Sequence, residues 1–173
     1  MIMNNKVKVL SLKPGTKYLG LAVLENKDLI YWKNKFIKSK RTEEKKVLNR
    51  VRVILSKIID FYHPKLIAIE KLAYPQAKES RLLNKIVKEI ELMFKGKKLR
   101  VYFYSPSEVK SFICRNDKPS KMNTAKIISS CYPWLYKDYE KEKNKSWFKE
   151  KYKLRFFDAI AVGLYCLHQQ RRK

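Results

Sequence analysis

Two carboxylates in this chain occupy settings that suit metal-dependent phosphodiester chemistry. Glu70 directly follows the apolar run 66–69, and Asp158 lies near the start of the strongly apolar segment 156–169. Two-metal cleavage needs carboxylates from separate elements to converge on ions about 4 Å apart, and a charge beside so much apolar surface is costly unless it is paired or coordinated. Taken alone, Glu70 reads as an exposed strand-end acid and Asp158 as a helix N-terminal charge. Their occurrence in one strand–helix order favours a shared site.

The first part of the chain predicts a run of short strands. Strands are expected at residues 7–12, 18–25 and 29–37, separated by turn residues at 14–15 and 26–28. Three consecutive short strands predict an antiparallel meander.

The middle of the chain alternates helices with strands. Apolar residues recur at spacings of three and four over 47–62 and 82–94, which predicts two amphipathic helices. His63-Pro64 ends the first helix. The fully apolar run 66–69 is typical of a strand covered on both faces, and a further strand is predicted at 99–104.

The last part of the chain is mostly helical. Residues 105–108 open a short helix with a serine cap, a proline and an acid. Helices are also predicted over 121–131 and 156–169, whereas 136–153 has no clean period. With no internal repeat or linker, residues 1–173 are expected to form a single domain. Its fold class is α/β: a mixed sheet of three antiparallel strands and then two parallel ones, with helices on both faces.

The charge of the chain predicts a polyanionic partner. Forty-one Lys and Arg stand against sixteen Asp and Glu, for a net charge of +25 and a pI near 10. A generally lysine-rich composition would raise the number of acids as well. Nucleic acid is therefore the expected partner. An anionic membrane is a distant alternative, since no segment resembles a basic amphipathic anchor or a membrane span.

The cysteines predict a reducing, cytoplasmic location. Cys114, Cys131 and Cys166 are odd in number and widely spaced in helical or apolar surroundings, so all three are interpreted as reduced core residues. With only His63 and His168 beside them, a zinc site is not expected, and the N-terminus carries no secretory signal.

Four motifs, taken in order, resemble the RuvC family of Holliday junction resolvases over most of the chain. They are Leu-Lys-Pro-Gly-Thr at 12–16, Ile-Ala-Ile-Glu at 67–70, the strand-and-helix segment 104–110 with 118–121, and Phe-Asp-Ala-Ile-Ala-Val at 157–162. The resemblance implies a ribonuclease-H-like fold and a homodimer that recognises four-way DNA junctions. It also implies magnesium-dependent cutting by four carboxylates.

Only Glu70 and Asp158 match the four carboxylates that the resemblance implies. Lys13 stands at the first acidic position, and Arg155 stands where the family usually has another acid. These replacements move the site's formal charge from about −4 to about 0, which disfavours a divalent cation. Lys13 and Arg155 are expected to pair with the two remaining acids, so that the site could hold a phosphate but not readily activate water.

Other residues carry roles implied by the resemblance. Lys110 and Lys121 match basic positions that help bind or cleave the scissile phosphate, and Tyr74 lies one residue from an aromatic that wedges into the junction. Glu108 or Asp117 could stand in for a missing acid, although neither lies where the family places one.

Aromatic residues interleave with lysines late in the chain. They are Trp134, Tyr136, Tyr139, Trp147, Phe148 and Tyr152. This pattern suits either stacking on single-stranded bases or packing of the loop on the domain.

The sequence thus favours a structure-selective binder of four-way junctions in recombination or repair, with nuclease activity weak or lost. One alternative is an active magnesium-dependent nuclease of the same fold, acting on branched DNA or on RNA. The other is a general nucleic-acid-binding protein without catalysis.

Overall fold

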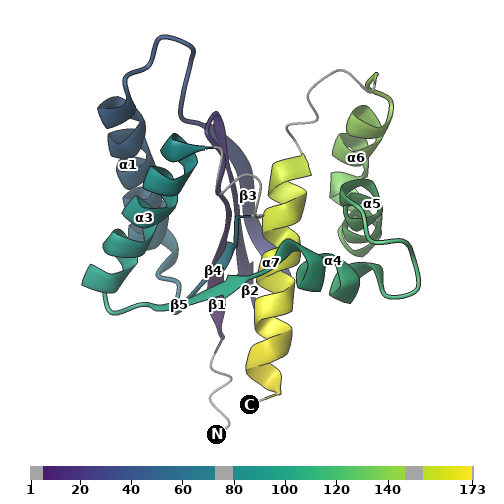
Figure 1. Cartoon of the computed structure of the whole chain (residues 1–173). Helices are drawn as coiled ribbons and strands as arrows, with labels where there is room; N and C mark the ends of the chain where they lie inside the picture. The colour runs from purple at the N-terminus through teal and green to yellow at the C-terminus, as the bar shows by residue number, and fades with distance from the viewer. Residues whose placement is uncertain (1–5, 73–79, 147–153, 173) are drawn as a thin grey trace, which may run out of the picture.

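The structure, a computed structural model, describes residues 6–72, 80–146 and 154–172 (Figure 1). Its strands are β1 Lys8–Lys13, β2 Tyr18–Glu25, β3 Asp28–Phe36, β4 Leu66–Glu70 and β5 Arg100–Tyr104. They form one sheet in the order β3-β2-β1-β4-β5. The pairs β1–β2 and β2–β3 are antiparallel, and β1–β4 and β4–β5 are parallel. The predicted mixed sheet is confirmed.

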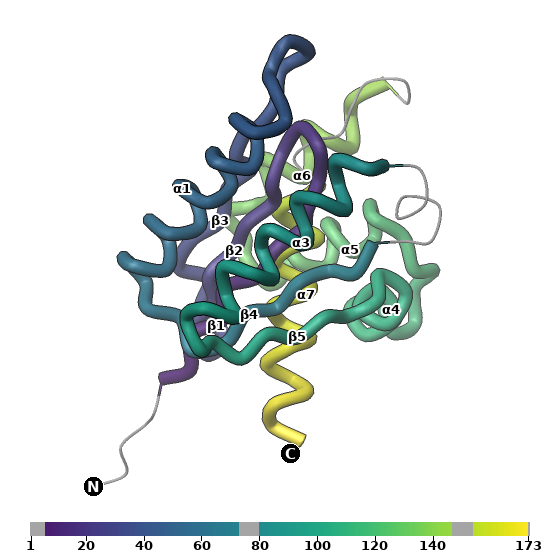
Figure 2. Tube along the Cα trace, turned by 60° about the vertical axis from the view of Figure 1, so that its left-hand side comes forward, coloured from purple at the N-terminus to yellow at the C-terminus, as the bar shows by residue number. Residues whose placement is uncertain are grey.

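Helices cover both faces of this sheet. Their bounds are α1 Glu44–Tyr62, α3 Arg81–Gly96, α4 Pro106–Cys114, α5 Lys121–Cys131, the 3-10 turn η1 Pro133–Leu135, α6 Tyr136–Lys143 and α7 Leu154–Arg171. Helices α1 and α3 lie on one side, and α4, α5, α6 and α7 on the other (Figure 1). Seen from the side of α1 and α3, α7 runs behind the strands (Figure 2). None of the helices in the described ranges is long and apolar enough to cross a membrane.

Helix α6 occupies part of the stretch 136–153, in which the sequence shows no clean period. Its burial explains the missing period, because only Tyr139 and Glu142 of its eight residues are buried. A helix with so narrow an apolar face leaves little periodic signal. Cys131 also departs from the prediction: Cys114 and Cys166 are buried, but Cys131, the last residue of α5, is exposed.

Side-chain alternation divides the core into two layers. Leu10, Leu12, Ile67 and Ile69 point toward α1 and α3, in one cluster of buried apolar residues. Their neighbours in sequence point the other way, so that Val9, Leu66 and Ala68 pack in the cluster that contains α7. Because successive side chains on a strand alternate between faces, Lys13 and Glu70 belong to the α7 side.

Two glycines let α7 lie close to the sheet. A Cβ on Gly163 in α7 would overlap Leu24 of β2 and come within 2.7 Å of Ser11 Oγ in β1. A Cβ on Gly20 in β2 would come within 2.7 Å of the carbonyl carbon of Arg155. Both crossings therefore depend on the absence of a side chain, and they fix where α7 passes over β1 and β2.

We expect Gly163→Ala to lower the free energy of unfolding by about 2 kcal/mol, which is typical of an overpacked core. Gly96→Ala is the matched control, because a Cβ there meets nothing within 4 Å and Ala is the better helix former. Urea unfolding of both variants checks this expectation. Equal stability of Gly163→Ala and the unmodified chain would show that α7 can move away from the sheet without cost.

Candidate functional site

Strand register brings Lys13 and Glu70 side by side. Leu12 of β1 pairs with Ile69 of the parallel strand β4, so the next residues, Lys13 and Glu70, end their strands next to each other. Both face α7, as alternation requires. The carboxyl ends of parallel strands meet at one edge of a sheet, which is where these side chains converge.

Lys13 and Glu70 form a buried ion pair. The Lys13 Nζ donates to Glu70 Oε1, and the residues are only 8% and 3% exposed. Neither charge could be buried alone without a large desolvation cost. The expectation that Lys13 lies within ion-pair reach of the retained acids is therefore confirmed.

Asp158 lies next to this pair. It is the fifth residue of α7, it is 3% exposed, and its Oδ2 has no hydrogen-bond partner among the described residues. Burial, and then repulsion from Glu70, raises the pKa of Asp158 from 3.8 to about 6, against the attraction of Lys13, Lys121 and Lys110. The predicted proximity of Glu70 and Asp158 is confirmed.

Two further lysines face the same carboxylate. Lys121 is the first residue of α5, and Lys110 lies in α4. Desolvation, followed by repulsion from Lys13, Lys110 and Arg155, lowers the pKa of Lys121, while Asp158 opposes that shift. The fold therefore gathers four cations around two carboxylates.

Arg155 does not pair with Asp158 as the sequence analysis expected. Its guanidinium lies against Gly15, in the turn between β1 and β2, where a Cβ would overlap it. The carbonyl of Arg155 rests on Gly20, so this end of α7 directs the arginine toward the turn. Residues three apart on a helix can form an ion pair, but this packing directs Arg155 away from Asp158.

The cations line a pocket of about 250 Å³ at the edge of the sheet. Lys13, Lys121 and Arg155 contribute charge, and Thr16 and Ser80 contribute hydroxyl groups. Neither Thr16, which belongs to the motif at 12–16, nor Ser80 was predicted from the sequence to line a site. Ser80 accepts a hydrogen bond from the Leu83 amide as the N-cap of α3, and a serine before an apolar helix is a signal that could have found it.

These residues do not fit the magnesium that the family resemblance implies. The Lys13 ammonium occupies one face of Glu70, and an ammonium both repels a divalent ion and supplies no ligand. Among residues 6–72, 80–146 and 154–172, no group of three or more His, Cys, Asp or Glu could hold a metal. The donor set suits an anion instead.

The other candidates have mixed outcomes. Glu108 caps α4 in a reciprocal box with Ser105, whose hydrogen bonds lower the pKa of Glu108, so it does not replace a missing acid. Trp134 is exposed and Tyr139 is buried. Tyr74 lies outside the described residues, as do three of the late aromatics: Trp147, Phe148 and Tyr152.

The mixed sheet, its helices on both faces and the site at its carboxyl edge define a ribonuclease-H-like protein. The family model described as crossover junction endodeoxyribonuclease RuvC matches residues 9–132. The chain belongs to the RuvC family. A search of curated proteins finds no match.

Three solved structures share the fold. Thermus thermophilus RuvC, in complex with a Holliday junction substrate, is 16% identical with a TM-score of 0.71, over 95% of this chain and 96% of that one. The yeast mitochondrial Holliday junction resolvase is 14% identical with a TM-score of 0.64, over 96% and 81% of the two chains. The fowlpox virus resolvase, in complex with Holliday junction DNA, is 17% identical with a TM-score of 0.57, over 95% and 99%.

Asp158 should make the free energy of unfolding depend on pH. The folded chain keeps a proton on Asp158 up to about pH 6, whereas its ordinary pKa is 3.8. The folded state thus binds more protons in this window, and stability should fall as pH rises through it, by on the order of 2 kcal/mol. Urea unfolding between pH 4 and 7 measures this slope, which Asp158→Asn should reduce. The exposed control Asp117→Asn should leave it unchanged, and an unaltered slope in Asp158→Asn would contradict the assignment.

Proposed function

We propose that this chain binds four-way DNA junctions selectively, and that its nuclease activity is weak or lost. The observation that carries the proposal is the buried ion pair of Lys13 with Glu70 beside Asp158. A fixed ammonium in this position attracts phosphate and opposes a divalent cation. The RuvC fold supplies the scaffold, and the similar Thermus and fowlpox virus proteins form complexes with Holliday junctions.

The proposed role of the pocket is to hold a DNA phosphate. The Arg155 guanidinium can donate to two phosphate oxygens, and Lys121 adds a second cation. Burial, and then repulsion from Lys13, Lys110 and Arg155, lowers the pKa of Lys121, and an entering phosphate relieves that repulsion. Glu70 is held by Lys13, and Asp158 is buried beneath these cations, so neither is free to activate water. This arrangement supports the proposal of binding without hydrolysis.

Two copies of the chain acting together would explain selectivity for branched DNA. We propose that residues 1–173 act as a single domain and form a homodimer, because two pockets held at a fixed separation can clasp two arms of one junction. The remaining positive surface, with a net charge of +25, would contact the arms without reading their sequence.

Junction affinity should fall log-linearly with salt concentration and remain above that for linear duplex of equal length. Lys110→Gln and Lys121→Gln should each weaken junction binding about tenfold and reduce the salt slope by about 1. Fluorescence anisotropy with labelled junction and duplex measures both quantities.

Lys57→Gln is the matched control for this experiment. Lys57 is an exposed residue of α1, on the opposite face of the sheet, so its loss should change affinity little. Equal affinity for junction and duplex at every salt concentration would favour a general nucleic-acid binder over the proposed function.

Restoring the two acids should restore metal binding. Lys13→Asp alone should bind magnesium weakly because Arg155 still opposes it, whereas Lys13→Asp with Arg155→Asp places four carboxylates at the site. We expect the double variant to bind magnesium by calorimetry and to cut junctions faster than the unmodified chain. Lys13→Asn with Arg155→Asn removes the same cations but adds neutral amides in place of carboxylates, so it should bind magnesium far more weakly and should not cut faster than the unmodified chain.

The unmodified chain provides the opposite test. We expect little or no cleavage of junction DNA or structured RNA with magnesium or manganese. Robust cleavage that Glu70→Gln abolishes would establish an active nuclease and overturn the proposal.

A further inference from the structure

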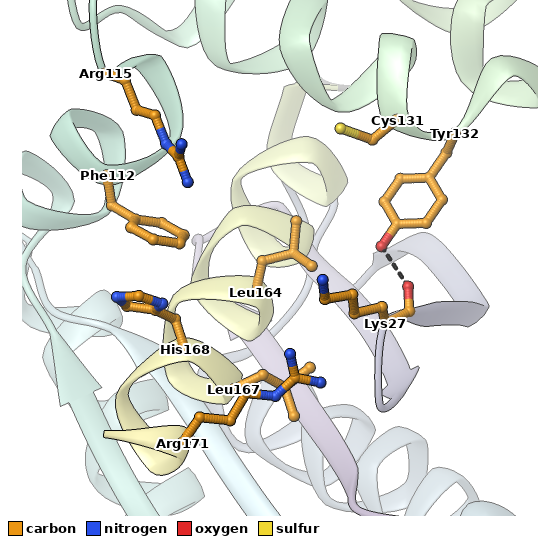
Figure 3. Close-up of a pocket in the computed structure, with 9 residues that line it drawn as sticks. All are labelled: Lys27, Phe112, Arg115, Cys131, Tyr132, Leu164, Leu167, His168 and Arg171. Atoms are coloured by element: carbon orange, nitrogen blue, oxygen red, sulfur yellow. Dashed lines mark hydrogen bonds between the residues drawn. The ribbon is translucent and has the colours of Figure 1, made fainter. Parts of the chain in front are cut away.

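A second, larger pocket lies at the other end of α7. Its volume is about 450 Å³, and it is bounded by α4, α5, α7 and the turn between β2 and β3 (Figure 3). Arg155 and Arg171 are sixteen residues apart on α7, which corresponds to about 24 Å along the helix. The pocket is therefore separate from the Lys13–Glu70 site, and no single nucleotide could occupy both.

Apolar and aromatic side chains form the lining of this pocket. Leu164 lies between the surrounding side chains in Figure 3, with Leu167 below it. The rings of Phe112 and His168 lie against each other, with centroids 4.7 Å apart and planes at 34°. Tyr132 is held in place because its hydroxyl donates to the Lys27 carbonyl at 2.7 Å. The pocket thus offers flat aromatic surface on a leucine floor.

Three cations surround this lining. Lys27 comes from the turn between β2 and β3, Arg115 from the end of α4 and Arg171 from the end of α7 (Figure 3). None of them lies within 4 Å of a carboxylate among the described residues, and no acid lines the pocket. Their charge is left for a ligand.

We propose that this pocket binds a nucleoside monophosphate group, with the base on the aromatic lining and the phosphate between the cations. The volume suits a small ligand of this size. Aromatic side chains stack on any base, and arginine donates to phosphate oxygens in pairs. A phosphate monoester carries about two negative charges at pH 7, whereas a carboxylate carries one. The phosphate therefore balances the charge of the three cations better than a carboxylate would. The group is either a free nucleotide or the 5′-phosphorylated end of a DNA strand.

Calorimetry with adenosine 5′-monophosphate, adenosine and inorganic phosphate tests whether both halves of the ligand are recognised. In Lys121→Gln, which weakens the phosphate pocket at the sheet edge, we expect one site for the monophosphate and binding at least about tenfold weaker for each of the other two. Inorganic phosphate binding as tightly as the nucleotide would overturn the role of the aromatic lining. Adenosine binding as tightly would overturn the role of the cations.

Charge-matched variants locate the site. Arg171→Gln and Arg115→Gln should each weaken nucleotide binding about tenfold. Arg172→Gln and Lys118→Gln remove the same charge from exposed neighbours that do not line the pocket, and they should have little effect. Equal losses of nucleotide affinity in all four variants would show that binding depends only on the overall positive charge, and would overturn the proposal. Junction affinity should survive Arg115→Gln, so failure here is distinguishable from failure of the proposed function.

Cys131 gives a readout in the unmodified chain. It lines the pocket and is exposed, whereas the other two cysteines of the chain are buried. Adenosine 5′-monophosphate should slow the alkylation of Cys131 by iodoacetamide, which mass spectrometry measures. Unchanged alkylation at saturating nucleotide would contradict the site.

A single-stranded oligonucleotide with a 5′-phosphate then distinguishes the two sources of the nucleotide group. Protection by the oligonucleotide identifies a DNA end, and protection by the mononucleotide alone identifies a free nucleotide.

Discussion

The buried ion pair between Lys13 and Glu70 is the interaction on which the site depends. It joins the carboxyl ends of β1 and β4 beneath α7, where each residue is almost fully excluded from water. Removing one partner of such a pair leaves an uncompensated buried charge, which typically costs about 3–5 kcal/mol. The pair forms only in the parallel register of β1 and β4, which places Lys13 next to Glu70. Because Lys13 neutralises Glu70, the surrounding site has a surplus of positive charge.

Helix α7 supplies the second constraint, because its two ends line the two pockets. Gly20 and Gly163 allow it to lie directly on β1 and β2. Its first turns bury Asp158 beside the ion pair and turn Arg155 toward Gly15. Its last turns carry His168 and Arg171 into the larger pocket. A shift of this helix would alter both pockets together.

Part of the surplus of positive charge is concentrated in the two pockets. At the sheet edge, Lys13, Lys110, Lys121 and Arg155 outnumber the two acids that they surround. Burial, and then repulsion among these cations, lowers the pKa of Lys121. At the far end of α7, Lys27, Arg115 and Arg171 surround an apolar floor. Like charges held together by packing favour an anionic ligand, since its binding removes repulsion as well as adding attraction.

The sequence alone determined most elements of the fold, with the exception of α6, and the two retained acids. Strand and helix periods are local properties, so the meander, the amphipathic helices and the apolar strand ending at Glu70 could be predicted from neighbouring residues. The pairing of Lys13 with Glu70 was also within reach, because adjacent parallel strands bring their carboxyl ends together. The position of Asp158 near the start of the apolar last helix likewise pointed to that residue.

Tertiary structure decided which side chains meet. Arg155 lies against Gly15 instead of pairing with Asp158, because the packing of α7 on Gly20 sets its direction. Thr16 and Ser80 enter the smaller pocket from two loops that are distant in sequence, and Cys131 is exposed because α5 ends beside the larger pocket. That pocket combines residues from four elements, and none of the residues that line it belongs to the motifs at 104–110, 118–121 and 157–162. Such convergence depends on the paths of α4, α5 and α7 over the sheet, which local patterning does not encode.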